Sequence, residues 1–125
     1  MLYAVLCYAS EDVVTGWTKA EDDAVMAKLF TVQEKYAKAG KLGPVARLLP
    51  TTAATTLRKV RGETVVIDGP FAETKEQFLG FYTVDCANLD EAVGFAREIS
   101  EANPSGGSYE IRPVGMLNPV KASIG

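Results

Sequence analysis

Residues 78–100, FLGFYTVDCANLDEAVGFAREIS, predict a strand that is followed at once by a helix. The strand is expected over Phe78 to Cys86, because aromatic and β-branched residues occupy both sets of alternating positions. Asn88 and Glu91 then form an N-terminal capping pattern, and Asn103-Pro104 marks the end of the helix. Within this helix apolar residues recur at helical spacing, at Leu89, Ala92, Val93, Ala96 and Ile99.

The N-terminal part of the chain shows the same order of elements. Leu2 to Tyr8 is aliphatic and aromatic and ends in a polar cluster, which predicts a strand. Thr18 followed by Glu21 is a capping box, and a helix is expected from about Lys19 to Ala39. The apolar positions of that helix are Val25, Leu29, Val32 and Tyr36.

Between the two helices lie weaker strand patterns. Arg47–Leu49 and Ala54–Val60 are strand candidates separated by Pro50, and Thr64–Ile67 follows after Arg61-Gly62. The glycine turn predicts that the second and third of these segments pair as a hairpin. A last strand is expected at about Tyr109–Leu117.

This order predicts one α+β domain over residues 1–125, a ferredoxin-like protomer with both helices on one face of a sheet. The first strand and Phe78–Cys86 carry apolar residues on both faces, so two helices leave the second face uncovered. We therefore expect a homodimer joined sheet to sheet, as in a dimeric α/β barrel. The alternative is that the hairpin or the C-terminal segment folds over that face.

Composition excludes several classes of function. The chain has 125 residues, 47% hydrophobic and 23% charged, which is typical of one soluble globular domain. The net charge is −3 and no basic run is present, so no nucleic-acid partner is expected. The absence of histidine excludes the usual general base, Ser-His and Cys-His nucleophiles and the commonest metal ligand.

Membrane, metal and redox roles are also not expected. The longest apolar run, residues 1–9, is too short to span a bilayer and lacks a preceding basic region, so we expect a cytoplasmic protein and no membrane partner. Cys7 and Cys86 lie in apolar strands outside any metal-binding spacing and are expected to be reduced and structural. Carboxylates alone would suit Mg²⁺ or Ca²⁺, but the spacing of Asp68, Glu73 and Glu76 matches no EF-hand, so neither a metal nor another cofactor is predicted.

The segment Asp68–Glu76 reads DGPFAETKE and permits two interpretations. Asp-Gly-Pro is turn chemistry, and Glu73–Gln77 then forms one turn of solvated helix. Alternatively, Phe71 anchors a loop that presents its charged side chains at the mouth of the sheet, where ligand sites tend to lie. Composition alone does not choose between the two.

The same nine residues resemble the motif of the DGPF branch of the YCII-related proteins. The resemblance continues through Gly80-Phe81-Tyr82, Leu89–Ala92 and Glu110–Val114, and so covers nearly the whole chain. It implies a dimeric α/β barrel of ferredoxin-like protomers, in a branch largely without assigned chemistry. The His-Asp pair proposed for some relatives has no counterpart here, and Phe78-Leu79 stands where a Leu-Gly pair is usual.

One hypothesis is a small-molecule enzyme or binding protein with a cleft beside the motif. Asp68 is then the catalytic carboxylate, and Lys75 is the cation that holds a small anionic molecule. The predicted ligand contacts are Tyr8, Arg47, Phe71, Glu73, Tyr82 and Arg112. Each of the arginines and tyrosines also has a structural interpretation, as a solvated strand residue or as a core or interface aromatic.

The second hypothesis is a non-catalytic regulatory or interaction module. In this case the dimer is the functional unit and the motif loop is structural. The resemblance suggests a context for it, because members of the DGPF branch are often associated with extracytoplasmic-function sigma factors.

Overall fold

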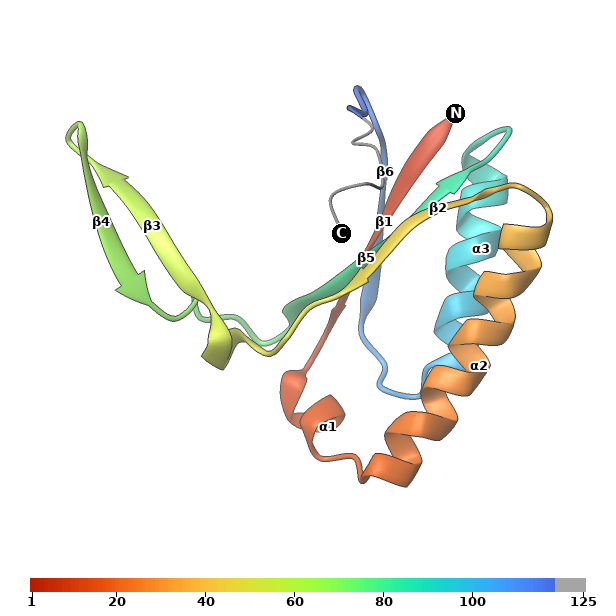
Figure 1. Ribbon diagram of the computed structural model, residues 1–125, viewed down its shortest axis with the longest axis horizontal. Helices are drawn as coiled ribbons and strands as arrows, with labels where there is room; N and C mark the ends of the chain where they lie inside the picture. The colour runs from red at the N-terminus through yellow and green to blue at the C-terminus, as the bar shows by residue number, and fades with distance from the viewer. Residues whose placement is uncertain (119–125) are drawn as a thin grey trace, which may run out of the picture.

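The computed structural model describes residues 1–118, which form a four-stranded sheet, a separate two-stranded sheet and three helices (Figure 1). The elements are β1 (Leu2–Ala9), α1 (Glu11–Thr15), α2 (Lys19–Lys38), β2 (Leu42–Arg47), the 3-10 turn η1 (Thr51–Ala53), β3 (Thr55–Val60), β4 (Glu63–Asp68), β5 (Gln77–Asp85), α3 (Leu89–Ala102) and β6 (Ser108–Pro113). The larger sheet has the order β2-β5-β1-β6 with every pair antiparallel. This agrees with the predicted ferredoxin-like α+β protomer.

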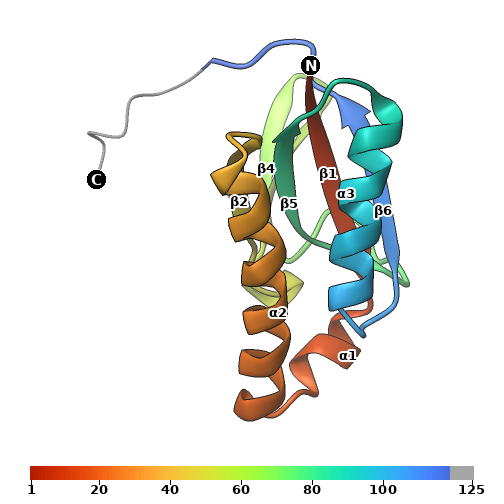
Figure 2. The ribbon, with the colours of Figure 1, turned by 90° about the vertical axis from the view of Figure 1, so that its right-hand side faces the viewer.

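Both long helices lie on the same face of the larger sheet (Figure 2). The core between them is built from the inward residues of β1 and β5, such as Val5 and Val84, and from Phe95 and Ile99 of α3, all at most 1% exposed. The Phe95 ring meets Tyr36 and Tyr82 edge-on, at centroid distances of 4.7 and 5.5 Å. Helix α3 is therefore anchored at the centre of the core.

The helix starts follow the capping residues expected from the sequence. The Thr18 hydroxyl accepts from the Glu21 amide at 3.1 Å, and the Thr18 amide donates to the Glu21 carboxylate at 3.1 Å, which completes the capping box of α2. At α3 the Asn88 side chain accepts from the Glu91 amide at 3.0 Å. These bonds satisfy backbone donors that have no partner within a helix.

The first edge strand lies earlier in the chain than predicted. Residues 42–47 form β2 and residues 48–50 do not continue it, so the predicted strand Arg47–Leu49 is wrong beyond Arg47. Gly43 and Pro44 weaken the strand pattern, but proline is tolerated on an edge strand. The Thr83 hydroxyl of β5 donates to the Pro44 carbonyl at 2.8 Å and so helps to hold the irregular strand in place.

Three further differences from the predicted elements are found. Helix α1 was not predicted; Glu11 at its start accepts from the Thr51 amide and hydroxyl, which are distant in sequence, at 2.9 and 3.0 Å. The helical turn at 73–77, one of the two interpretations of the motif segment, is absent, and the Gln77 side-chain amide donates to the Thr74 carbonyl. The last strand ends at Pro113, earlier than about Leu117.

The hairpin β3–β4 projects from the body as an arm, residues 55–68 (Figure 1). Arg61 and Gly62 both have positive φ, which confirms the predicted turn. The two strands pair only with each other, so the alternative that the hairpin folds over the larger sheet is wrong. The rest of that alternative, the C-terminal segment 119–125, lies outside the described residues.

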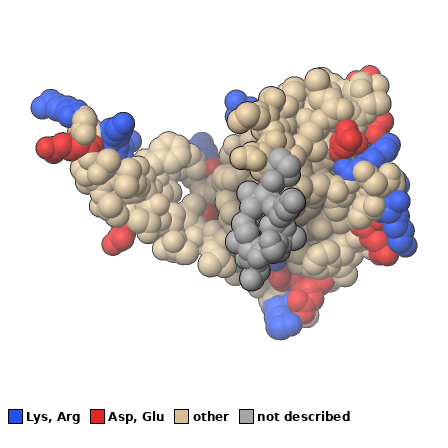
Figure 3. Space-filling model, turned by 45° about the horizontal axis from the view of Figure 1, so that its top comes forward, with Lys and Arg blue, Asp and Glu red and all other residues tan. Residues whose placement is uncertain are grey.

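The arm exposes apolar side chains along its length, including Leu57 and Val66 at 64% and 67%. Charged side chains gather at its tip, and the surface between the tip and the body is largely uncharged (Figure 3). The charged residues near the turn are Arg58, Lys59, Arg61 and Glu63. An isolated two-stranded hairpin is marginally stable in water, so the arm presents surface suited to a partner.

The second face of the larger sheet is apolar at its centre, and Glu110 and Arg112 of β6 place charged side chains at its edge. Because Val5 points to the helices, Ala4 and Leu6 point to the opposite face, where Leu6 stands beside Phe81 of β5. All three residues are only partly buried. We define this surface as the open face; it agrees with the prediction that two helices cover one side only.

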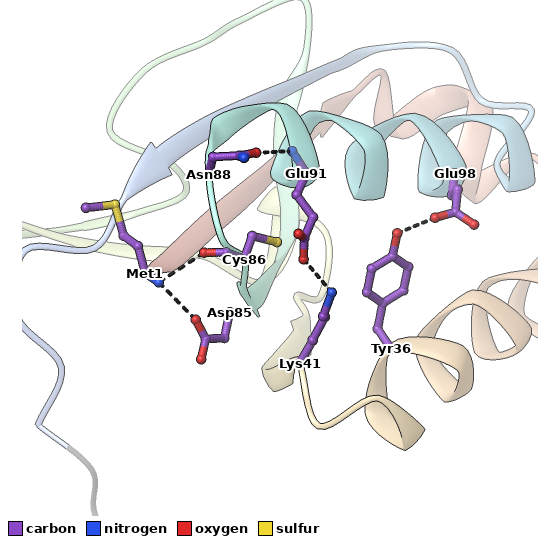
Figure 4. Close-up of polar contacts among 8 residues, drawn as sticks. All are labelled: Met1, Tyr36, Lys41, Asp85, Cys86, Asn88, Glu91 and Glu98. Atoms are coloured by element: carbon purple, nitrogen blue, oxygen red, sulfur yellow. Dashed lines mark hydrogen bonds and ion pairs between the residues drawn. The ribbon is translucent and has the colours of Figure 1, made fainter.

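Two ion pairs join the C-terminal end of α2 and the segment after it to α3, and Figure 4 shows the pair of Lys41 with Glu91 and the hydrogen bond of Tyr36 to Glu98. Lys35 and Tyr36 both donate to Glu98, the lysine at 2.7 Å, and Lys41 lies 2.6 Å from Glu91. The Lys35 hydrogen bond, and then that of Tyr36, holds the pKa of Glu98 below its usual 4.5. Lys41 lowers the pKa of Glu91 in the same way.

These lowered pKa values predict a stability that falls in acid. A carboxyl with a lowered folded-state pKa stabilises the fold above its unfolded pKa, and this contribution is lost as the pH falls through the folded-state value. Glu98→Gln removes one such carboxyl. When the pH is lowered from neutral to below about 4, the free energy of unfolding in urea is therefore expected to fall less in this variant than in the wild type. Glu34→Gln, in the exposed pair with Lys38, is the control and should follow the wild type. An acid-induced loss in Glu98→Gln equal to that of the wild type would show the prediction to be wrong.

Candidate functional site

The motif segment 68–76 connects the arm to β5. Gly69 has φ +104°, a value that favours glycine, which supports the turn chemistry of Asp-Gly-Pro. Its amide donates to the Ala54 carbonyl at 2.7 Å, and its carbonyl accepts from the Thr56 hydroxyl at 2.8 Å. The turn is therefore fixed against the start of β3.

Beyond this turn the segment forms one wall of a groove of about 750 Å³, which we call the motif groove. The opposite wall is the segment 48–54, and the floor comes from the ends of β1 and β5. Its apolar lining includes Leu48, Leu49, Pro50, Pro70, Phe71 and Phe78. Tyr8 and Phe78 lie side by side with ring centroids 5.5 Å apart, while Phe71 is 75% exposed.

Most polar groups of the motif groove already have partners. The Glu76 carboxylate accepts from the Ser108 hydroxyl at 2.9 Å, and Thr51 donates to Glu11. The Tyr8 hydroxyl makes only a long contact of 3.5 Å with Glu110. Among the lining residues that the structure describes, Glu76 is the only charged one. The groove thus offers apolar walls and a hydroxyl that is weakly engaged.

Some of the predicted site residues come together here and others do not. Tyr8 and Phe71 line the motif groove, whereas Asp68 and Lys75 do not. Asp68 pairs with Thr55 at the base of the arm, so it stands on the strand and not in the loop. Lys75 lies between two lining residues and has no ion pair within residues 1–118.

The remaining predicted contacts are spread over the molecule. Arg47 pairs with Asp22 near the start of α2, and Tyr82 is buried beneath the helices. Glu73 is exposed on the motif loop, and Arg112 is exposed on the edge strand β6. The roles given to Asp68, Lys75 and these residues therefore stay predictions.

The sequence analysis missed the wall formed by Leu48, Leu49 and Pro50. Leu49 is 80% exposed and Leu48 is 43% exposed. The Leu-Leu-Pro sequence at 48–50 is consistent with an apolar loop, but the two leucines also fit the end of a strand, which is what the sequence pattern predicts. Their place in the groove depends on the Leu48 amide, which donates to the Leu79 carbonyl at 2.8 Å.

Cysteine, metal and membrane chemistry add little to the site. Cys7 and Cys86 are both free, and burial raises the pKa of Cys7 to about 12, so this thiol is protonated at neutral pH. The described part of the chain has no group of three or more His, Cys, Asp or Glu side chains placed to hold a metal ion. Within the same residues, no helix is both long and apolar enough to cross a bilayer.

Comparison with known proteins gives two results. The profile of a family described as the YCII-related domain matches residues 1–118. A protein of Rhizobium meliloti (strain 1021), described as uncharacterised, is 66% identical over 119 residues, which cover 95% of this chain and 96% of the relative. Neither description includes an activity, a ligand or a regulatory partner.

Proposed function

The chain belongs to the YCII-related family, and we propose that it is a homodimer of the DGPF branch that binds a small organic acid in the motif groove. The observation that carries this proposal is that the motif segment walls a groove of about 750 Å³, a size within the range of ligand pockets. The ligand's apolar body lies against Phe71 and Phe78. Its anionic group meets Lys75 at the rim.

The chemistry of the groove supports a ligand with an apolar body. Aromatic rings at Tyr8, Phe71 and Phe78 supply large contact areas, and burying such a side chain contributes about 1.5–3 kcal/mol. The Tyr8 hydroxyl is available to orient a polar group. Glu76 is engaged by Ser108, whereas Lys75, its neighbour in the chain, has no ion pair among the described residues and is the cation that we assign to the anionic group of the ligand.

Two unpartnered surfaces support the homodimer. The open face is apolar at its centre, around Leu6 and Phe81, and the arm carries exposed apolar residues on a hairpin too small to be stable alone. Figure 1 shows that the arm extends away from the helices, beyond the side of the sheet that they leave uncovered. In a two-fold dimer each open face covers the other and each arm reaches the other protomer.

Binding of phenylacetate, compared with its neutral amide phenylacetamide, tests the ligand part of the proposal. We expect Phe71→Ala to weaken both probes about tenfold, because the ring supplies apolar contact. Lys75→Met should weaken only phenylacetate, about two- to fivefold, since an exposed charge pair contributes about 0.2–1 kcal/mol. Isothermal titration calorimetry of the intact wild type and both variants measures the six affinities.

Lys59→Met near the tip of the arm is the matched control and should leave both affinities unchanged. The melting temperature and the solution mass of each variant show that fold and assembly are kept. If Phe71→Ala binds both probes as tightly as the wild type does, the ligand does not lie in the motif groove. If Lys75→Met prefers phenylacetate over phenylacetamide as strongly as the wild type does, Lys75 does not bind the carboxylate.

A further inference from the structure

A second cavity lies on the helix side of the sheet, away from the motif segment. It has a volume of about 100 Å³ and is lined by α2, the residues before it, the C-terminal end of α3 and the covered face of the sheet. Trp17, Met26 and Leu29 form the apolar wall, and Tyr82 and Tyr109 approach from the sheet. No residue of the motif segment 68–76 lines it.

The interior of this helix-side cavity is neutral. Burial raises the pKa of Tyr82, Tyr109 and Cys7 to about 12 each, so all three groups are protonated at neutral pH. Arg47 is the only charged residue among the described residues that line the cavity. An uncharged body with a negative end therefore fits it best, because burying a charge without a partner is strongly unfavourable.

Arg47 stands where the cavity meets a wider vestibule of about 510 Å³. The two spaces share Val14, Trp17 and Leu79 as well as Arg47. The guanidinium now holds the Asp22 carboxylate with two bonds, of 2.7 and 3.3 Å. The other charged groups of the vestibule are occupied, since Lys19 pairs with Asp23 and Glu11 accepts from Thr51.

We propose that the helix-side cavity binds a short aliphatic monocarboxylate, with its hydrocarbon end inside and its carboxylate on Arg47 in place of Asp22. A two-bond arginine–carboxylate contact has the same geometry whether the carboxylate belongs to the protein or to a ligand. A volume of about 100 Å³ is smaller than a cavity that holds benzene and accommodates a body of about four carbon atoms. Asp22 then acts as an internal competitor that occupies the arginine in the empty protein.

The single tryptophan provides a direct readout. Trp17 lines both the cavity and the vestibule but not the motif groove, so its one indole N–H resonance reports occupancy of this site alone. Isovalerate is the probe and isovaleramide is its uncharged counterpart. In the wild type, isovalerate should shift the indole resonance saturably, and the amide should bind at least about tenfold more weakly, because a charged carboxylate makes stronger hydrogen bonds to a guanidinium than a neutral amide does.

Substitutions in the Arg47–Asp22 pair test whether Asp22 competes with the ligand carboxylate for Arg47. Asp22→Asn removes the competing charge and should tighten isovalerate binding several-fold, whereas Arg47→Met should weaken it about tenfold or more. Glu34→Gln, on the same helix but paired with Lys38 and lining neither space, is the matched control and should behave as the wild type. Melting curves confirm that each variant is folded, and Asp22→Asn keeps the test decisive where Arg47→Met does not fold.

The proposal is overturned if neither the wild type nor Asp22→Asn shows a saturable indole shift with isovalerate, or if isovaleramide binds equally well. A gain in Glu34→Gln equal to that in Asp22→Asn would equally contradict the competition by Asp22. Phe71→Ala should leave the indole titration unchanged, because Phe71 lines only the motif groove. The experiment can therefore reject ligand binding in the helix-side cavity without rejecting ligand binding in the motif groove.

Discussion

Phe95→Ala is expected to lower the free energy of unfolding by about 3–5 kcal/mol, because it removes a fully buried ring from the centre of the core. The ring meets Tyr36 of α2 and Tyr82 of β5, so its loss weakens both helix–helix and helix–sheet packing. A domain of this size has a total stability of about 5–15 kcal/mol, and the variant is expected to be near the limit of folding. Urea denaturation followed by circular dichroism measures the difference.

The matched control is Phe30→Ala on the outer face of α2. Phe30 is 57% exposed, so its truncation should change the free energy of unfolding by about 0.5 kcal/mol at most. A loss at Phe30 as large as that at Phe95 would contradict the assignment of the core to the inner faces of α2, α3 and the sheet.

Leu6→Lys is expected to convert the proposed homodimer into a monomer. Leu6 lies on the open face beside Phe81, and a two-fold interface would bury two copies of the introduced charge. Glu110 of β6 stands opposite Leu6, but replacing apolar contacts by a buried ion pair still costs about 1–4 kcal/mol for each of the two copies. The dissociation constant should therefore rise at least about thirtyfold, or about 2 kcal/mol. Light scattering during gel filtration should show a mass near 13.4 kDa for the variant and twice that value for the wild type.

Phe30→Lys is the control for surface charge, because Phe30 is exposed on the helix side of the molecule. It should remain a dimer. Val66→Lys on the arm should weaken the dimer without changing the fold, which separates loss of assembly from unfolding. A Leu6→Lys variant that keeps the wild-type mass, or a wild type that is monomeric at micromolar concentration, would rule out the open face as the interface.

The elements predicted correctly are those with a local signal. Helices α2 and α3 have capping residues and sustained periodicity, and β1 and β5 have dense β-branched and aromatic runs. Strand β2 and helix α1 lack such a signal. β2 contains Gly43-Pro44 and is held by Thr83, and α1 is only five residues long and is held by contacts of Glu11 with η1 and β5. Contacts of this kind cannot be read from a single segment.

The candidate site was predicted in part for the same reason. The motif identified the loop and its turn, and Phe71 and Tyr8 do lie in the groove beside it. The placement of Asp68 on the arm, away from the groove lining, follows from the pairing of β3 with β4. Arg47 was expected beside the motif, but its pairing with Asp22 depends on how α2 packs against β2 and places the arginine at the helix-side cavity.

The central claim is that the motif segment forms a wall of a small-molecule site. An amide nuclear magnetic resonance titration of the intact protein with phenylacetate at neutral pH tests it most directly. We predict saturable shifts concentrated in residues 48–56 and 70–78, the two walls of the motif groove. Saturation without shifts in these two segments, or no saturable shift at millimolar phenylacetate, would contradict the claim.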